Sequence, residues 1–561
     1  MMSSRKCGSG MIRSIVVWAI FLLCFKCDSP FSIHIHIHGF TIPTITTTTT
    51  TRSTSSIIIR SSSSNDVNNA EDIEKDRKAY PQQPPHSERH FLPTHPSYTP
   101  NNNNKNHKNH KNWRREIPFL WKKKSQKKRT KRFFEGWYYR VTLPSTNESF
   151  AFIFSIEDPI PIKNKNKNKN NQIPSSPLSL ATVQIMGPQD GDYLVECTPD
   201  HTKFWAHQNC QAFGCVFQYN NTHTTSHTHT TTVIPPNQFF QTVQSGFQML
   251  PTRLQGIVAN GHDGSTNVSQ GTPSPYSPTT FDLNISPISG WGDDQDHRQK
   301  STAGWLASHS VFEPHWQVTL ADARVSGTIT WKNKTYHITD APFYAEKNWG
   351  GGFPIKWHWL QCNSFNNYNH QRLSITAVGA IRKLPLKTQE TVGLLCIHYN
   401  GIFYEAVPWT GQVSWTVDPW GKWYYIGRCT SGNRLFEAEV SITCPTNGTI
   451  LRAPTPDGMI LACKDAFQGQ GTLNMWDLQY DTHTRTYKRS THIIQNATTN
   501  QAAVEIGGGP WWDTWNGTTR MKQPFKSLVK IPYLADKIVQ NIKSIPSNNN
   551  NNNNNNNKGQ N

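Results

Sequence analysis

The sequence of 561 residues lacks the short motifs that bind nucleotide cofactors and structural metals. No GxGxxG pattern follows a predicted strand and no P-loop is present, so nucleotide cofactors have no support. No set of cysteines and histidines has the spacing of a zinc site. Histidines cluster at residues 33–39 and 223–231, where they could bind a metal adventitiously. We therefore expect no cofactor and no functional metal.

Long hydrophobic runs are absent after Cys24, where no stretch of eighteen apolar residues occurs. The one apolar segment, residues 14–24, follows basic residues and is too short to span a bilayer, which is typical of a secretory signal peptide over residues 1–27. Residues 29–65 contain no acidic residue and are rich in Ser and Thr, so residues 28–65 resemble a transit peptide. Together they predict a two-step route into a plastid bounded by extra membranes. Plain secretion with a disordered Ser/Thr stalk is the alternative.

Acidic residues are nearly absent from the next region as well. Residues 101–132 contain thirteen Lys or Arg and one acidic residue, so +12 of the net charge of +19 lies there. We interpret residues 66–130 as a disordered basic linker and residues 546–561 as a disordered poly-Asn tail. Because the charge is not on a folded face, nucleic-acid binding is not expected. Electrostatic attachment to an anionic lipid surface is the alternative role of the linker.

Helical periodicity is almost missing, with one possible helix near residues 531–542. From Phe133 onward the apolar pattern has a period of two, separated by short Gly, Pro, Asn and Asp turn signals. It predicts strands at residues 137–143, 150–156, 181–186, 316–331, 373–381, 393–399, 412–417, 422–427, 436–442 and 472–480. The fold class expected is all-β, with antiparallel barrels whose inward positions line a ligand cavity.

The state of the cysteines depends on the compartment. Eight of the eleven cysteines fall in the region expected to fold, and an even count suits disulfides in a secreted protein. In a plastid they would more often be buried free thiols. Sequons such as the one at Asn147 would matter only under secretion.

One stretch, residues 340–363, concentrates the chemically distinctive residues. Glu346 is its only carboxylate after Asp340, and it lies among many aromatic side chains and three consecutive glycines. Burial in such a pocket would raise the pKa of the carboxyl and keep a proton available near neutral pH. Indole faces nearby could stabilise a cation. In the alternative interpretation, Glu346 pairs with Lys347 or Lys356 on a solvated loop and the tryptophans fill a core.

The same stretch resembles the tocopherol cyclase family. Six more Trp-rich or apolar strings are similar to that family, at residues 133–144, 150–159, 183–196, 304–318, 406–427 and 506–512. The likeness covers roughly residues 131–540. The YxExNWG pattern at residues 344–350 is also similar to bacterial carotenoid hydratases, which protonate an isoprenoid double bond. The resemblance implies two lipocalin-like β-barrel domains, residues 131–355 and 356–545.

The resemblance also implies a cofactor-independent cyclase acting on a phytyl or related prenyl benzoquinol. Protonation of the alkene nearest the ring would give a tertiary carbocation, which the quinol oxygen attacks to close a chromanol ring. By match to the hydratases, Glu346 is the expected acid, although they have Asp there, and Tyr344 is its hydrogen-bond partner or relay. His358 is expected to accept the quinol proton, and the expected substrate-binding residues are Trp316, Trp349, Trp357, Trp359, Phe343 and Phe353.

Two other functions fit the same pattern. A lipocalin-like module could carry a prenyl lipid without catalysis, and a secreted glycosylated β protein is the other alternative. For the cyclase, the insoluble substrate predicts peripheral attachment to a plastid membrane or lipid droplet (plastoglobule).

Overall fold

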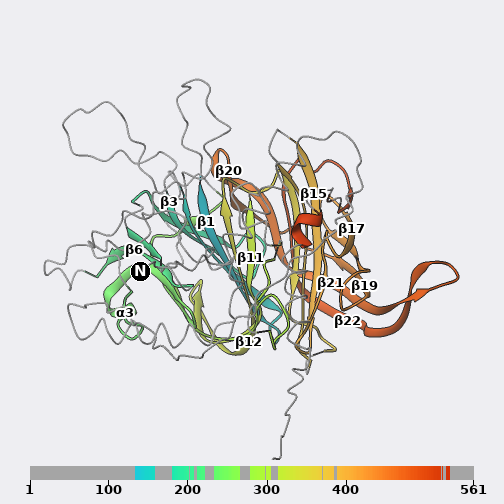
Figure 1. Ribbon diagram of the computed structural model, residues 1–561. Helices are drawn as coiled ribbons and strands as arrows, with labels where there is room; N and C mark the ends of the chain where they lie inside the picture. Colours follow the sequence, from blue (N-terminus) through green and yellow to red (C-terminus); the bar gives the residue numbers. More distant parts are fainter. Residues whose placement is uncertain are drawn as a thin grey trace, which may run out of the picture. The chain divides into compact units, whose positions relative to one another are not determined.

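The computed structural model confirms the all-β class: strands dominate the part of the chain it describes (Figure 1). The described residues are 133–157, 180–200, 203–206, 211–220, 233–265, 278–296, 299–302, 304, 314–368, 371–383, 388–519, 521 and 526–530. Residues 69–521 form one unit, and residues 1–68 with 522–561 form a second, described only for a helical turn at 526–530. The expected signal, transit segment, linker, tail and helix at 531–542 lie outside the described residues.

The first sheet contains twelve antiparallel strands. In spatial order these are β5 (Phe204–Ala206), β6 (Phe213–Tyr219), β7 (Val243–Leu250), β8 (Arg253–Val258), β10 (Thr279–Ser289), β11 (His315–Trp331), β12 (Lys334–Gly350), β1 (Phe134–Leu143), β2 (Glu148–Glu157), β3 (Leu180–Met186), β4 (Tyr193–Thr198) and β9 (His262–Asp263). One short helix, α3 (Phe239–Thr242), precedes β7.

The second sheet contains eleven strands, also antiparallel. Ten follow the order β16 (Ile402–Ala406), β15 (Gln389–Tyr399), β14 (Leu373–Lys383), β13 (Lys356–Cys362), β22 (Thr486–Gly508), β21 (Gly458–Asp481), β19 (Phe436–Thr443), β18 (Lys422–Cys429), β17 (Gly411–Val417) and β23 (Trp515–Thr518). The eleventh, β20 (Thr449–Thr455), pairs with β21. All ten strands expected from the period-two pattern are present.

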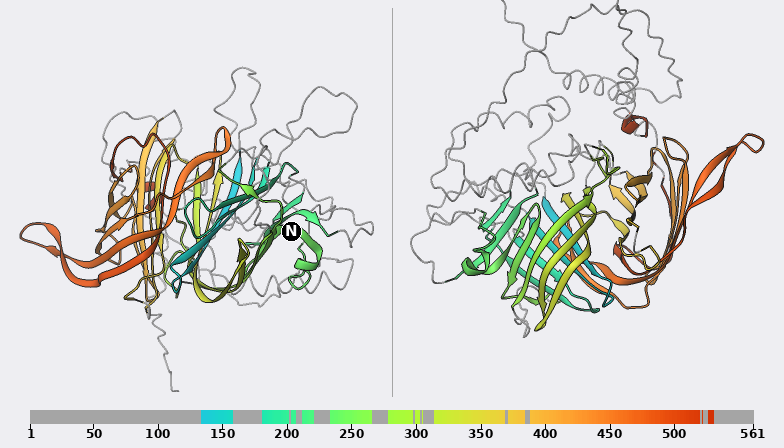
Figure 2. Two further views of the ribbon diagram at one scale, coloured as in Figure 1. Left: turned by 180° about the vertical axis from the view of Figure 1, so that it is seen from behind. Right: turned by 90° about the horizontal axis from the view of Figure 1, so that it is seen from below.

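Each sheet curls around its own apolar core (Figure 2). On β2 the alternating residues Phe150, Phe152, Phe154 and Ile156 are fully buried in the first core. In the second sheet the side chains on this side come from β13 through β22, for example Leu360. We call these sides the inner faces. Alternation sends every second side chain of a strand to the same face, which explains the period of two in the sequence.

The opposite sides of the two sheets meet, and we call them the meeting faces. Arg140 of β1 crosses between them: it donates to the Oε1 of Gln361 on β13 at 2.8 Å and to the carbonyl oxygen of Gln501 on β22 at 2.6 Å. Its guanidinium also bonds to Ser149 at 3.2 Å. A buried cation must be paired in this way, because an unpaired charge in a low-dielectric interior is very costly. Arg140 therefore fixes the register of one sheet against the other.

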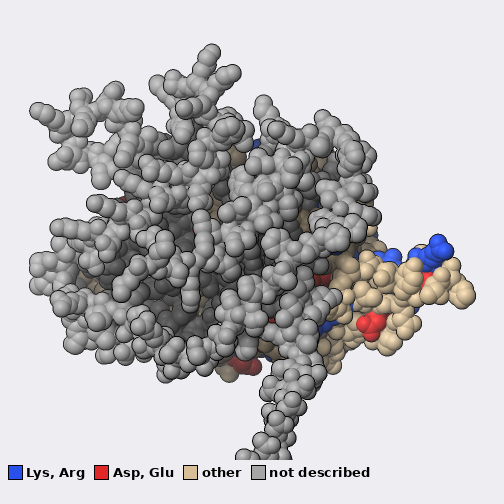
Figure 3. Space-filling model, in the orientation of Figure 1, with Lys and Arg blue, Asp and Glu red and all other residues tan. Residues whose placement is uncertain are grey.

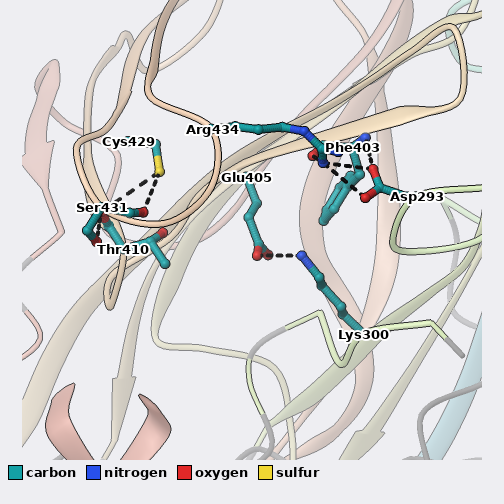
Figure 4. Close-up of polar contacts among 8 residues, drawn as sticks. All are labelled: Asp293, Lys300, Phe403, Glu405, Thr410, Cys429, Ser431 and Arg434. Atoms are coloured by element: carbon teal, nitrogen blue, oxygen red, sulfur yellow. Dashed lines mark hydrogen bonds and ion pairs between the residues drawn. The ribbon is translucent and has the colours of Figure 1, made fainter. Parts of the chain in front are cut away.

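A second connection comes from the residues after β10, 290–296 and 299–302 (Figure 4). Asp293 accepts a hydrogen bond from Arg434 at 2.8 Å and another from the backbone N–H of Phe403 at 2.7 Å. Lys300 forms an ion pair with Glu405 at 2.8 Å. Strands before Gly350 belong to the first sheet and strands after Lys356 to the second. The division into two domains at residue 355 stays a prediction, because a change of sheet does not establish independent folding.

The ends of β21 and β22 form a long hairpin that projects beyond the second sheet (Figures 1 and 2). Basic side chains lie toward its far end in the space-filling view (Figure 3). Within the described residues, no helix has the length and hydropathy needed to cross a bilayer. The cysteines that the structure describes are free thiols: Cys197, Cys215, Cys362, Cys396, Cys429, Cys444 and Cys463.

Candidate active site

The position of Glu346 is set by the hairpin of β11 and β12. Lys332 and Asn333 at its tip both have positive φ, 48° and 63°, as a tight two-residue hairpin turn requires. The register that follows places Glu346 opposite Val318 of β11 on one side and opposite Tyr138 of β1 on the other. Glu346 therefore lies on a central strand of the first sheet, on its meeting face.

An irregularity in β11 brings an indole to this carboxylate. The register of β11 against β12 shifts between Val318 and Leu320, as at a β-bulge. Leu320 consequently packs in the inner core, whereas Trp316, also an even-numbered residue, lies on the meeting face. A simple alternation would have placed both on one side.

Glu346 is held by three side-chain donors. Its Oε2 accepts from the Nε1 of Trp316 at 2.9 Å and from the hydroxyl of Tyr344 at 2.7 Å, and its Oε1 accepts from the Nδ2 of Asn348 at 3.0 Å. Burial raises the pKa of Glu346, and these hydrogen bonds lower it in part; the net direction is upward. The indole N–H of Trp359 also approaches Glu346 without completing a hydrogen bond.

The alternative interpretation of Glu346, an ion pair on a solvated loop, is wrong. The residue is on a strand and is 7% exposed. Lys347 points to the other face, where it pairs with buried Glu135 at 3.0 Å. The ammonium of Lys356 lies over the ring of Trp511, 4.1 Å from its centroid. Glu346 thus combines burial with hydrogen bonding from neutral donors, and neither lysine neutralises it.

A cavity lies between the meeting faces, beside Glu346. Side chains of both sheets line it, among them Tyr138, Trp316, Phe353, Trp357, Trp359 and Val378. The expectation that inward barrel positions line the ligand cavity is therefore wrong, because the inner faces are filled by their own cores. Gly507 makes room for one wall: a Cβ there would lie 2.0 Å from the ring of Trp357.

Of the nine site residues predicted from the sequence, five line the cavity: Glu346, Trp316, Phe353, Trp357 and Trp359. Tyr344 lies beside it through its hydrogen bond to Glu346. Phe343, Trp349 and His358 do not line it. Phe343 is in the inner core, where it stacks on Tyr139 with ring centroids 5.9 Å apart.

Strand alternation turns the side chains of His358 and Trp349 away from the cavity. His358 lies between two cavity residues of β13, so its side chain points to the inner face, where its Nδ1 shares a hydrogen bond of 2.8 Å with the hydroxyl of Tyr425. Burial lowers the pKa of His358 well below its usual value. Trp349 stacks on His315, with centroids 4.9 Å apart. The structure thus does not place His358 where it could accept a proton from a molecule in the cavity.

Three polar residues of this region were not identified from the sequence. Tyr138 lines the cavity, and its hydroxyl has no hydrogen-bond partner among the described residues. Glu505 of β22 also lines the cavity and accepts a hydrogen bond from the Nε1 of Trp357. Asp465 of β21 lies directly opposite Glu505, fully buried, and neither of its oxygens has a side-chain donor.

Burial raises the pKa of both carboxyls, Glu505 and Asp465. It raises the pKa of Glu505 to about 7, a shift that the hydrogen bond from Trp357 opposes. It also raises the pKa of Asp465 well above its usual value, and the neighbouring Glu505 adds to that rise. Because two adjacent carboxylates in a low-dielectric site cannot both ionise readily, the pair carries its negative charge on Glu505, the member with a donor.

The described residues contain no group of three or more His, Cys, Asp and Glu placed to hold a metal ion. The cavity instead offers apolar and indole walls, one buried carboxyl with a raised pKa and a second carboxyl with a pKa near neutrality. Such an arrangement can deliver a proton to an apolar molecule, receive one from it and shield a cation from water.

Comparison with known proteins adds independent information. Residues 131–508 match the family described as tocopherol cyclase-like. The chain is 39% identical over 389 residues to a rice (Oryza sativa subsp. japonica) protein named "Probable tocopherol cyclase, chloroplastic", covering 69% of this chain and 78% of the rice protein. It is 36% identical over 403 residues to the maize (Zea mays) protein named "Tocopherol cyclase, chloroplastic", covering 71% of this chain and 80% of the maize protein.

Solved structures show a weaker similarity. Kievitone hydratase from Nectria haematococca aligns with a TM-score of 0.30 and 12% identity, over 67% of this chain and 89% of that one.

Proposed function

Because this chain belongs to the tocopherol cyclase-like family, we propose that it closes the chromanol ring of a prenylated benzoquinol, as a step of tocopherol (vitamin E) biosynthesis. The substrate is a quinol with a phytyl or related prenyl chain. The observation that links this activity to a particular site is the buried carboxyl of Glu346 beside an aromatic cavity. The reaction is an isomerisation, so atoms and oxidation state balance without a co-substrate.

Glu346 is the proton donor in this proposal. The trisubstituted alkene nearest the ring takes the proton on its less substituted carbon, which leaves a tertiary carbocation. The raised pKa of Glu346 keeps the carboxyl protonated to a higher pH than a solvated Glu. After transfer, the new carboxylate is stabilised by the donors already in place, Trp316, Tyr344 and Asn348. The site is thus organised for the charge that appears during the reaction.

The aromatic walls protect the cation. Trp357 and Trp359 present indole rings to the cavity, and Phe353 packs against Trp357 with centroids 5.3 Å apart. Aromatic faces stabilise a nearby cation by about 0.5–2 kcal/mol. They also exclude water, which would otherwise capture the cation and give an alcohol. The quinol oxygen then closes the ring.

The test is an incubation of the full-length protein with a phytyl benzoquinol under reducing conditions, followed by chromatography. Formation of the chromanol above a no-protein control is the expected result. Tight binding without conversion would contradict the cyclase assignment and favour a carrier of prenyl lipids. Sensitivity to an endoglycosidase would favour the secreted glycosylated protein.

We place the protein in a plastid, in agreement with the names of the rice and maize relatives. Within it, we propose peripheral attachment to a membrane or lipid droplet, because the substrate is insoluble in water. The hairpin of β20 and β21 supports this idea. Its residues Leu451 and Met459 line the cavity, while Ile450, Ile460 and Leu461 are exposed by 51%, 42% and 39%. An apolar surface next to the cavity suits contact with a lipid surface that supplies the substrate.

A further inference from the structure

The proposed ring closure needs a group that accepts the quinol proton, and the cavity contains a second carboxyl across from Glu346. We propose that Glu505 is this base. The inference rests on the proposed function, since it assigns the second proton transfer of that reaction. Trp359 joins the two carboxyls: it lies opposite Glu505 in the pairing of β13 with β22, and its ring lies 5.4 Å from that of Tyr138, which in turn lies opposite Glu346.

Two buried donors without a completed hydrogen bond, on Tyr138 and Trp359, indicate where a polar ligand group would lie. Tyr138 and Trp359 line the cavity and are 9% and 6% exposed. The hydroxyl of Tyr138 has no hydrogen-bond partner among the described residues, and the indole N–H of Trp359 approaches Glu346 without completing a hydrogen bond. A buried donor that makes no hydrogen bond costs about 1–3 kcal/mol. A quinol oxygen in the cavity satisfies such a donor, so its O–H is placed near Glu505 while the prenyl alkene faces Glu346.

Glu505 is suited to accept a proton and Asp465 is not. Glu505 is partly accessible through the cavity it lines and keeps a hydrogen bond from Trp357. Asp465 is fully buried behind it and does not line the cavity. The other titratable groups that interact with Glu505 are Cys463, Tyr138 and Glu346, and burial raises the pKa of each. Of the two adjacent carboxyls, a negative charge is therefore less costly on Glu505, which has the indole donor, than on Asp465.

The step balances. A C–H bond forms with the proton of Glu346, a C–O bond forms between the quinol oxygen and the tertiary carbon, and the quinol O–H bond breaks with its proton on Glu505. Glu346 ends ionised and Glu505 ends protonated. Exchange of both carboxyls with solvent after product release restores the starting state. No oxidant, reductant or other co-reactant is needed.

The experiment measures single-turnover closure by the full-length protein between pH 5 and 9. In the wild type, the rate should fall as pH drops through the pKa of Glu505, about 7, because a protonated carboxyl cannot accept the quinol proton. Glu505→Gln can still accept the hydrogen bond of Trp357, so the fold is retained. It should close the ring about 10²-fold more slowly, lose the acidic limb of the profile and release more of the water-captured alcohol. Glu505→Asp should keep the acidic limb.

Asp465→Asn is the matched control. It replaces a neutral acid next to Glu505 by a neutral amide of the same shape, so the acidic limb and the ratio of alcohol to chromanol should stay as in the wild type. A Glu505→Gln protein with the wild-type rate and profile would overturn the assignment, as would loss of the acidic limb in Asp465→Asn alone. Both results presuppose chromanol formation by the wild type. Its absence would instead contradict the proposed function.

Discussion

The inner faces and the meeting faces of the two sheets are built by the same strands, yet their chemistry is opposite. On β2, Phe152 and Phe154 fill the inner core, whereas Ile153 and Ser155 between them line the cavity. On β13, Leu360 packs in the second core while Trp359 lines the cavity. The inner faces contain mainly apolar side chains in close contact, with the ion pair of Lys347 and Glu135 and the imidazole of His358 as polar exceptions. The meeting faces contain the carboxyls Glu346, Asp465 and Glu505 and the cation of Arg140.

The inner faces therefore contribute mainly to the stability of the fold, and the meeting faces contribute mainly to the chemistry of the site. Apolar cores stabilise a fold through burial, at about 25 cal/mol per Å², without any directional requirement. Buried polar groups stabilise little and need specific partners, as Arg140 finds in Gln361 and Gln501. Among the buried polar atoms without a hydrogen-bond partner, those of Tyr138 and Trp359 belong to residues that line the cavity. We therefore expect changes on the inner face to alter the free energy of unfolding and changes on the meeting face to alter catalysis.

The largest effect is expected on the meeting face, from Glu346→Gln. The amide keeps the shape of the side chain but has no transferable proton, so turnover should fall about 10²-fold or more. Glu346→Asp should retain partial activity, because the acid remains with a shorter reach. In the wild type, the rate should fall as pH rises through the raised pKa of Glu346, since the ionised form cannot donate.

The control for this variant is Glu196→Gln. Glu196 is also a buried carboxyl with a raised pKa, but it accepts hydrogen bonds from Ser245 at 2.6 Å and from the backbone N–H of Asn260 at 3.1 Å, and it does not line the cavity. Equal losses of turnover in Glu196→Gln and Glu346→Gln, measured on folded protein, would mean that removing any buried carboxyl is harmful.

Phe154→Ala tests the same comparison between the two faces by a change on the inner face. Removing a fully buried phenylalanine from the first core should lower the free energy of unfolding by about 3–5 kcal/mol. Turnover per folded molecule should change little, because the cavity is on the other face of the sheet. Chemical denaturation and an active-site titration give the two quantities, and a normal unfolding midpoint with a large loss of turnover would reverse the assignment of the faces.

A smaller effect is expected at the exposed hairpin of β20 and β21. Replacing Ile450, Ile460 and Leu461 together by serine should weaken binding to vesicles of plastid-like galactolipids about tenfold, since apolar contact with the interface is lost. Turnover of substrate presented in detergent should stay the same. Flotation on a density gradient measures the first quantity. Unaltered flotation would exclude this hairpin as the contact.

The smallest effect is a shift of one pH inflection in Tyr344→Phe. The hydroxyl of Tyr344 stabilises the ionised form of Glu346, so its removal should raise the pKa of the acid. The fall in rate on the alkaline side should then occur at higher pH. Tyr425→Phe serves as control, because that hydroxyl bonds to His358 on the inner face. An alkaline shift in the control, or a downward shift in Tyr344→Phe, would contradict the role given to Tyr344.

Much of the fold follows from local sequence pattern. Alternation alone predicts ten of the strands and so separates the two sets of side chains on β2, whereas β13 was not among the predicted strands. The location of the cavity could not be predicted in this way, because it depends on contacts between distant segments. Arg140 and Gln361, for example, are 221 residues apart in the chain.

The predicted site residues that lie at the cavity come from the stretch where the sequence concentrates unusual residues and from Trp316, and their roles stay predictions. Nearness in sequence suggested His358 and Phe343, but alternation along β13 and β12 turns both to the inner face. Glu505 was missed because a single acid between Val504 and Ile506 is an ordinary pattern for a half-exposed strand. Only its pairing with Asp465 and its place in the cavity distinguish it.

The most direct test of the central claim is a single turnover in D₂O with protein equilibrated there beforehand. Glu346 exchanges its proton for deuterium, so the chromanol formed by the wild type should contain one deuterium, on the ring carbon next to the new quaternary carbon, and closure should be slower than in H₂O. Glu346→Gln should form this product no faster than the protein-free reaction. Ring closure without solvent-derived hydrogen, or wild-type deuteration by Glu346→Gln, would contradict proton delivery by Glu346 between the sheets.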